Sequence, residues 1–357
     1  MFSESRTEKK RNEDVIYASD NLWIVCDAAS GLTKTDWMHE GSDAAWFSHF
    51  LVNRIIKALQ PALTDDKVSV QTAFSFPDRP ARTGSLSEIL ASACQQAAAI
   101  FPSCSELEMP SAAIAILYRN ESRQQFEYLV LGDCVLLAEL VYSQVPVDPE
   151  KPAGQERIIN QEKLAKADKS NADQDKNNAK ADENKEGDQE GRTNFNFDRP
   201  DSPVCKITDS TIASFDGIAL DFMKAKSQAS NEPFLAQRLL ANEILIANRK
   251  KKNQPDGYAI ADCTTRWAGR ELTGTIPLNA LKRAALYSDG FDQLHTFLQA
   301  DQTIQSDQDF LNYIFDHQSE ILDLLHDRQE QDAACQILPR LKLRDDTSVI
   351  LVDFPPR

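Results

Sequence analysis

The sequence predicts a domain that combines β-strands with α-helices, and two features of the chain indicate this. Apolar runs of strand length, such as "LWIVC" and "AAIAILYR", alternate with longer segments whose apolar residues recur at helical spacing. The apolar share of 41% in 357 residues is enough for a substantial core. Because the strand runs are apolar at nearly every position, we expect strands buried on both faces, or a sheet sandwiched between other layers.

The expected elements follow one another along the whole chain. We expect strands at "VIYAS", "LWIVC", 112–119, 125–133, 134–141, 257–263, 271–278, "AALYS" and "RDDTSVILVDF". We expect helices over 42–59, 85–101, 211–227, 232–252 and 306–328. The basic run "NRKKKN" is interpreted as a solvated helix end, where cations favour the C-terminal dipole, with attraction of a phosphorylated partner as the alternative.

Residues 144–203 are expected to be a disordered polar insert within a single domain that spans residues 1–357. Their central stretch, "KLAKADKSNADQDKNNAKADENKEGDQEG", alternates acids with bases and contains no aromatic residue. Such a composition cannot bury a core. We interpret the segment as a tolerated loop insertion between two sheet elements.

Composition and charge exclude several classes of function. The net charge of −16 argues against nucleic acid or an anionic membrane surface as the main partner. No apolar run approaches the roughly 20 residues of a spanning helix, and the N-terminal residues lack the apolar core of a signal peptide. The seven cysteines form no CxxC pair, which is typical of buried thiols in a reducing cytoplasm, and the five histidines show no zinc-site spacing.

Acidic residues lie at the ends of four predicted strands: Glu13 and Asp14, Asp27, Asp289, and Asp345 and Asp346. Any one of them is usually a turn or cap residue, but strand ends are also where ligand crevices form. Oxygen ligands without histidine or cysteine suit Mg²⁺ or Mn²⁺. More than three carboxylates suit two ions that share a bridging carboxylate, an arrangement that supports phosphoryl hydrolysis.

Five short motifs, "NED", "VCDAASG", "LGDCVLL", "LYSDGF" and "RDDTSVILV", occur in this order between about residues 12 and 353. Together they resemble the metal-dependent serine/threonine phosphatases, the type 2C protein phosphatase family, and "GSDAAWFSHF" and "NRKKKNQPDGYAI" resemble a bacterial subset of it. The resemblance implies an α+β fold, a two-sheet antiparallel β-sandwich flanked by helices in four α-β-β-α layers. It also implies hydrolysis of phosphoserine and phosphothreonine in a phosphoprotein substrate with two Mg²⁺ or Mn²⁺ ions.

The resemblance further implies roles for individual residues. Asp27 would bridge both metals, and Asp289 and Asp345 would bind one of them; these three are the implied catalytic residues. Glu13 would bind the other metal, helped by the main-chain carbonyl of Ala28.

Three more acidic residues complete the implied metal site. Asp14 would order water at the metals, Asp133 would serve a third, weaker metal site, and Asp346 lies beside Asp345. The phosphate-binding arginine of the family has no unique match, and the substrate-binding candidates are Arg11 and Lys9, with Arg6 and Lys10 as alternatives.

Departures from the family pattern support an alternative hypothesis, a catalytically weak pseudo-phosphatase that acts as a binding or regulatory module. The family's usual Asp-Gly reads Asp27-Ala28, its Gly-Gly is reduced to "SG", and the opening of its middle strand reads "PSAA". A third interpretation is a plain sandwich whose acids are all caps and turns. Retention of Glu13, Asp27, Asp289 and Asp345 favours an active phosphatase.

Overall fold

The computed structural model describes residues 1–9, 11–32, 35–39, 41–60, 84–141 and 203–355. Residues 1–143 and 192–357 belong to one compact unit, and a second unit, 144–191, lies outside the described residues. Apart from residue 203, the predicted polar insert at 144–203 also lies outside them. Its disorder, and the single domain around it, therefore stay predictions.

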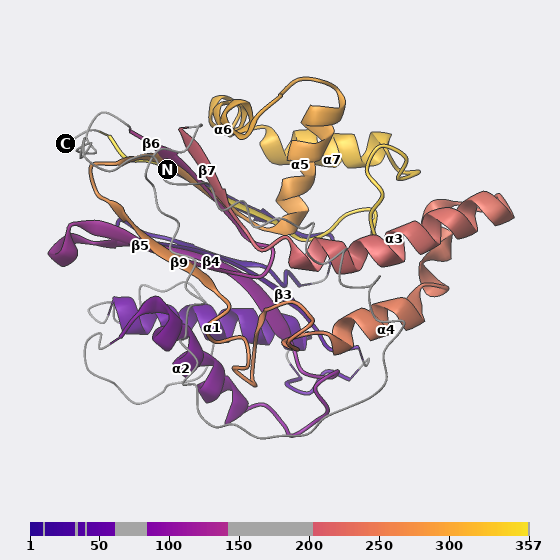
Figure 1. Ribbon diagram of the computed structural model, residues 1–357, viewed down its shortest axis with the longest axis horizontal. Helices are drawn as coiled ribbons and strands as arrows, with labels where there is room; N and C mark the ends of the chain where they lie inside the picture. Colours follow the sequence, from indigo (N-terminus) through magenta and orange to yellow (C-terminus); the bar gives the residue numbers. More distant parts are fainter. Residues whose placement is uncertain (10, 33–34, 40, 61–83, 142–202, 356–357) are drawn as a thin grey trace, which may run out of the picture. The chain divides into compact units, whose positions relative to one another are not determined.

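Two antiparallel sheets form the centre of the fold (Figure 1). Sheet A contains, in spatial order, β1 (Phe2–Arg6), β11 (Thr347–Asp353), β10 (Leu281–Tyr287), β6 (Val135–Leu140) and β7 (Val204–Ile207). Sheet B contains, in spatial order, β2 (Val15–Ala18), β3 (Leu22–Ala29), β4 (Ser111–Asn120), β5 (Gln125–Leu131) and β9 (Leu272–Pro277). The short β8 (Ala261–Asp262) pairs with β4, and a 3₁₀ turn, η2 (Glu121–Arg123), connects β4 to β5.

Helices cover the outer face of each sheet (Figure 1). Sheet B is covered by α1 (Asp43–Leu59) and α2 (Leu86–Ala98). Sheet A is covered by α5 (Asp289–Ala300), α6 (Asp307–Asp316) and α7 (Ile321–Gln331). The predicted α-β-β-α layers are therefore confirmed, and no helix among the described residues has both the length and the apolar character to cross a membrane.

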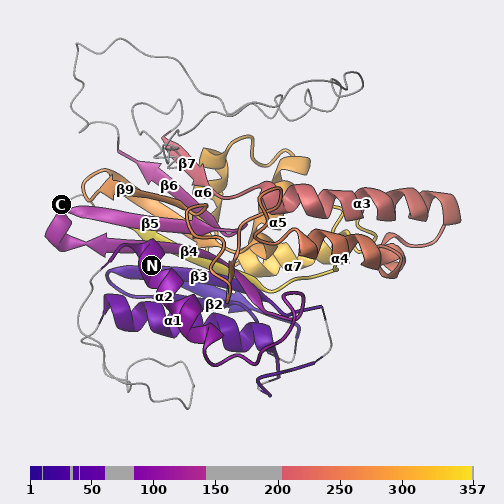
Figure 2. The same ribbon diagram turned by 60° about the horizontal axis from the view of Figure 1, so that its bottom comes forward.

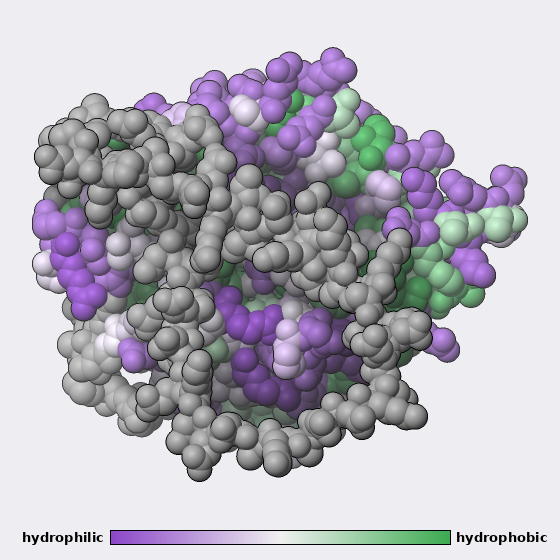
Figure 3. Space-filling view, viewed as in Figure 1, coloured by the Kyte–Doolittle hydropathy of each residue, from purple (hydrophilic) through white to green (hydrophobic). Residues whose placement is uncertain are grey.

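A third group of helices lies beside the sandwich and has a small core of its own (Figure 2). It consists of α3 (Thr211–Ser230), the 3₁₀ helix η6 (Phe234–Leu239) and α4 (Asn242–Lys250). Large hydrophobic side chains are exposed here, with 83% exposure for Leu239, 58% for Leu240 and 54% for Ile218. Figure 3 shows hydrophobic surface next to hydrophilic surface on this part of the molecule.

The strands read as continuous apolar runs because each sheet packs on both faces. In β3, Trp23 and Val25 pack between the two sheets, whereas Ile24 and Cys26 pack under α1 and α2. This division arises because successive side chains along a strand point to opposite faces of the sheet. The same alternation determines which face the polar residues at the strand ends occupy.

The structure differs from the sequence-based expectation in six elements, and three of them, β1, β7 and α5, were not expected at all. β1 has no apolar strand pattern because it lies at an edge of sheet A, where β11 is the only strand among the described residues that pairs with it. The expected helix 232–252 is divided into η6 and α4, and the expected helix 306–328 is divided into α6 and α7. The expected strand 257–263 is reduced to the two residues of β8.

Candidate active site

The first pair of carboxylates comes from sheet B. Trp23 and Val25 of β3 face the space between the sheets, so Asp27, two residues further, faces the same side. Val15 of β2 lies opposite Cys26. Continuing this antiparallel register by one residue places Asp14 opposite Asp27.

The second pair comes from the same end of sheet A. Tyr287 of β10 lies opposite Val135 of β6. Just beyond this pair lie Asp289, the first residue of α5, and Asp133, in the bend between β5 and β6, and both line one pocket. That bend needs glycine, because Gly132 has a φ of +79° and a Cβ there would lie 2.8 Å from the Ala113 Cβ.

The loop before β11 carries the next carboxylates to this end of the sheets. A Cβ at Gly290 would lie 2.2 Å from the carbonyl oxygen of Asp346, so only glycine lets the first turn of α5 approach this backbone. The approach brings Asp289, at the start of α5, near Asp345, whose charge raises the Asp289 pKa after the larger effect of burial.

Asp27 and Asp289 link the two sheets, because their carboxyl groups are close enough to share a proton. This hydrogen bond raises the pKa of Asp27 and lowers that of Asp289. Burial is the larger effect on both groups, and the charges of Asp14 and Asp345 also disfavour a second negative charge on Asp27. Both pKa values lie above their ordinary value as a net result.

Asp14 belongs with Asp27, Asp289 and Asp345 to one cluster of carboxylates, and it is buried, with 4% of the residue exposed. Burial, followed by the charges of Asp346 and Asp289, raises its pKa to about 7, although the neighbouring Ser348 and Asp27 side chains act in the opposite direction. Within the described part of the chain, neither of its carboxylate oxygens has a hydrogen-bond partner. A buried carboxylate without a partner is costly, so this position calls for a proton or a cation.

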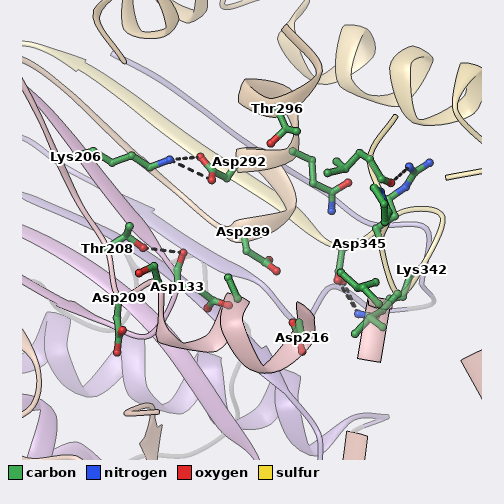
Figure 4. A pocket seen from close by; sticks show the side chains of 18 residues that line it. Asp133, Lys206, Thr208, Asp209, Asp216, Asp289, Asp292, Thr296, Lys342 and Asp345 are labelled. Carbon is green, nitrogen blue, oxygen red and sulfur yellow. Dashed lines mark hydrogen bonds and ion pairs between the residues drawn. The ribbon is translucent and has the colours of Figure 1, made fainter. Parts of the chain in front are cut away.

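A pocket of about 500 Å³ opens beside the cluster, and Asp133, Asp289 and Asp345 line it (Figure 4). Asp216 of α3 also lines it, and burial followed by the charge of Asp289 raises the Asp216 pKa to about 6. Burial, followed by the charge of Asp289, raises the Asp133 pKa well above its ordinary value. Excess negative charge therefore extends from the cluster into the pocket.

Two outer carboxylates are held by a lysine and by groups of the N-terminal segment. Lys9 Nζ donates to Glu13, and Ser42 Oγ donates to the same carboxylate at 2.5 Å. Asp346 accepts from Lys9 Nζ at 2.9 Å, from Thr7 Oγ1 at 2.6 Å and from the backbone N–H of Glu13 at 3.1 Å. Asp346 thereby ties the segment before β2 to the start of β11.

A second lysine holds Asp345. Lys342 Nζ lies 2.7 Å from one carboxylate oxygen of Asp345 and 2.8 Å from the other (Figure 4). No three His, Cys, Asp or Glu side chains in the described ranges are arranged so that they could hold one metal ion. The ligand roles predicted for these carboxylates thus remain predictions.

The predicted phosphate-binding residues occupy different settings. Lys9 contacts Glu13 and Asp346. Burial lowers the Lys9 pKa, but these two contacts outweigh burial and raise the pKa above its ordinary value. Arg11 is half-buried. The alternative Arg6 pairs with Glu4 and Asp323, and the alternative Lys10 lies outside the described residues.

Ala28 fits the position that the family pattern gives to glycine. It lies in β3 opposite Ala112, and its φ is not among the positive ones. Its side chain packs under the helices on the face opposite to Asp27. A methyl group here leaves the cluster of carboxylates undisturbed.

Sequence reasoning missed Asp216 and Lys342, because neither lies at the end of an apolar strand. The solvated interpretation of the basic run was wrong for two of its residues. Arg249 donates to the carbonyl oxygen of Ser30 at 2.7 Å and to Ser111 Oγ at 2.9 Å. Lys252 is 3% exposed and lies 3.4 Å from Asp262.

No protein-family model matches the sequence, and a search of curated proteins finds no match. Among solved structures, the chain is similar to the serine/threonine phosphatase PstP from Mycobacterium tuberculosis, with 12% identity, a TM-score of 0.37, and coverage of 99% of this chain and 96% of that one. It is also similar to the PPM phosphatase MsPP from Mycobacterium smegmatis, with 11% identity, a TM-score of 0.38, and coverage of 99% of this chain and 97% of that one. Its similarity to Stp1 from Staphylococcus aureus has 11% identity, a TM-score of 0.41, and coverage of 99% of this chain and 93% of that one. At these TM-scores the likeness does not define the function of this chain. These proteins are serine/threonine phosphatases, the kind of enzyme that the sequence motifs resemble.

Proposed function

We propose that the chain is a metal-dependent phosphatase that hydrolyses phosphoserine and phosphothreonine in proteins. One observation carries the proposal: Asp27 and Asp289 come from opposite sheets and lie close enough to share a proton, beside the buried and unpartnered Asp14. Three carboxylates in this arrangement need positive charge if all are to ionise at neutral pH. The proposal adds that positive charge as divalent cations.

The donor set fits Mg²⁺ or Mn²⁺, because it consists of carboxylate oxygens and these hard cations prefer oxygen. Asp27, Asp289 and Asp345 would hold one ion, and Glu13, Asp27 and the carbonyl of Ala28 would hold the other. Asp133 would serve a third, weaker site. When bound, the ions would lower the pKa of a water molecule and neutralise charge on the phosphoryl oxygens.

The chain's own residues would orient the reaction. Asp14 would accept a hydrogen bond from the attacking water and fix its direction, because its carboxylate is buried and has no partner among the described residues. Asp27 would lose the proton that it shares with Asp289 when cations replace it. Lys9, beside Glu13 and Asp346, and Arg11 are the candidates for contact with the substrate phosphate.

An assay with added Mn²⁺, using a phosphopeptide and p-nitrophenyl phosphate, tests this function. We expect hydrolysis of both substrates that requires Mg²⁺ or Mn²⁺ and resists inhibitors of the okadaic acid type. Full activity after exhaustive chelation would contradict the proposal.

The second candidate function is a pseudo-phosphatase that binds phosphoproteins without turnover. It is favoured by the two lysine contacts that hold Glu13 and Asp345. The same assay separates the two functions when phosphopeptide binding is measured in parallel. Binding with no hydrolysis at saturating Mn²⁺ would favour the pseudo-phosphatase.

A further inference from the structure

Lys342 makes a contact that a metal ligand cannot share. Its ammonium group lies 2.7 and 2.8 Å from the two carboxylate oxygens of Asp345, so both oxygens are engaged at once (Figure 4). A metal ion at Asp345 would need at least one of these oxygens. Two cations cannot occupy the same side of one carboxylate because they repel each other.

The charge of Lys342 reaches beyond its partner. Lys342 lines the same pocket as Asp216, Asp289 and Asp345, and its charge lowers the pKa of both Asp216 and Asp289, although burial raises each of them overall. The contact with Asp345 therefore places one positive charge where the cluster has an excess of negative charge.

The pocket also offers an internal comparison. Lys206 lines the same pocket and lies 2.9 and 3.2 Å from the carboxylate oxygens of Asp292 (Figure 4). Asp292 follows Asp289 by one turn of α5 and is not among the proposed ligands. The two lysines therefore make similar contacts, and only Lys342 engages a proposed metal ligand.

We propose that Lys342 is a built-in competitor of the divalent cation at Asp345. This inference rests on the proposed function. In the metal-free protein the ammonium group neutralises Asp345, and it must leave that carboxylate before a metal ion binds there. The unpartnered, buried Asp14 independently indicates that the site is built for additional positive charge.

The exposure of the pair makes this exchange reversible. The side chain of Lys342 is 43% exposed and that of Asp345 is 26% exposed. Ion pairs at this exposure are weak, because water and salt screen them. A divalent cation can therefore displace the lysine, but only after overcoming its competition, so Lys342 sets the metal concentration at which the site fills.

Calorimetric titration of the full, metal-free chain with Mn²⁺ tests the proposal. We expect Lys342→Met to bind Mn²⁺ about tenfold more tightly than the parent, because one unit charge beside a divalent ion is removed. Lys342→Arg keeps the charge and forms a two-pronged contact with a carboxylate, so its affinity should equal the parent's or be weaker. Lys206→Met, the matched control, should leave the affinity unchanged.

Asp345→Asn separates failure of this inference from failure of the proposed function. If Asp345→Asn weakens Mn²⁺ binding while Lys342→Met leaves the affinity unchanged or weaker, Asp345 is a ligand and Lys342 is not its competitor. Equal tightening in Lys206→Met would also overturn the inference, since it would reflect net charge alone. A parent chain that binds no Mn²⁺ would overturn both the inference and the proposed function.

Discussion

At the scale of single residues, Asp27 and Asp289 carry the chemistry proposed for the site. We expect Asp27→Asn and Asp289→Asn each to lower the Mn²⁺-dependent kcat for p-nitrophenyl phosphate by about 10³-fold or more, because the reacting groups lose their positioning. The fold should remain, since removal of one charge relieves repulsion in the cluster. Circular dichroism of the two variants checks the fold.

Asp292→Asn is the matched control for these substitutions. Asp292 lies one turn after Asp289 on α5 and pairs with Lys206, so its replacement should leave kcat within a few-fold of the parent. Near-normal turnover in Asp27→Asn or Asp289→Asn, with normal metal affinity, would refute the assignment of ligands.

Asp14 predicts how the stability of the metal-free protein depends on pH. Its pKa is raised from 3.8 to about 7 by burial and by nearby carboxylates. The folded protein then binds this proton more tightly than the unfolded chain, so the stabilisation is complete below about pH 4 and is lost as pH rises to about 7. The slope for one proton is at most about 1.4 kcal/mol per pH unit.

Urea unfolding at several pH values between 4.5 and 7.5, with a chelator present, measures this effect. We expect Asp14→Asn to have a shallower decline in the free energy of unfolding than the parent. Because Asp27, Asp133 and Asp216 also have raised pKa values, a smaller decline should remain in the variant. An equal slope in both proteins would contradict the assignment of the buried charge to Asp14.

At the scale of elements, Arg249 fixes α4 against the ends of β3 and β4. Its guanidinium donates to the carbonyl oxygen of Ser30 and to Ser111 Oγ. We expect Arg249→Met to lower the free energy of unfolding by about 1–3 kcal/mol, because it leaves these acceptors without their charged donor. Lys250→Met is the control, since Lys250 is the next residue of the same helix and is exposed. Equal losses in both variants would refute the anchoring role.

The elements also show which parts of the fold are predictable from sequence. Strands such as β3 and β4 are predictable because burial on both faces leaves them apolar at nearly every position. β1 is not, because "FSESR" is polar and its strand conformation depends on a partner some 345 residues away. Asp27 and Asp289 are predictable because they are acidic residues at the ends of apolar strands. Asp216 lies within a helix and Lys342 in a loop, where neither has a distinguishing local pattern.

At the scale of the whole molecule, the polar insert at 144–203 should be dispensable for folding and for the chemical step. Glu139 of β6 lies opposite Val204 of β7, and Leu140 donates its N–H to the carbonyl oxygen of residue 203 at 2.8 Å. The two strands can therefore be joined by a short turn. Shortening the connection between two strands changes the closure entropy by only ~1 kcal/mol and favours the folded state.

Deletion of residues 150–200 tests this expectation. The kcat for p-nitrophenyl phosphate and the thermal unfolding temperature should match those of the parent. A deletion confined to 155–185 serves as a milder control if the full deletion disturbs β6 or β7. A large fall in either quantity for both deletions would mean that the segment packs on the sandwich or reaches the pocket.

The pairing of β1 with β11 has a consequence for the protein during its synthesis. Phe2 lies opposite Leu351, so β1 cannot pair with β11 until the chain between them has been synthesised. Contacts of such large sequence separation form late. The strands next to Asp14 and Asp27 pair locally and can be in place early, whereas Asp345 and Asp346 are synthesised only just before β11. A nascent chain therefore cannot complete the carboxylate cluster before β11 has been synthesised, and any activity that depends on the cluster begins only then.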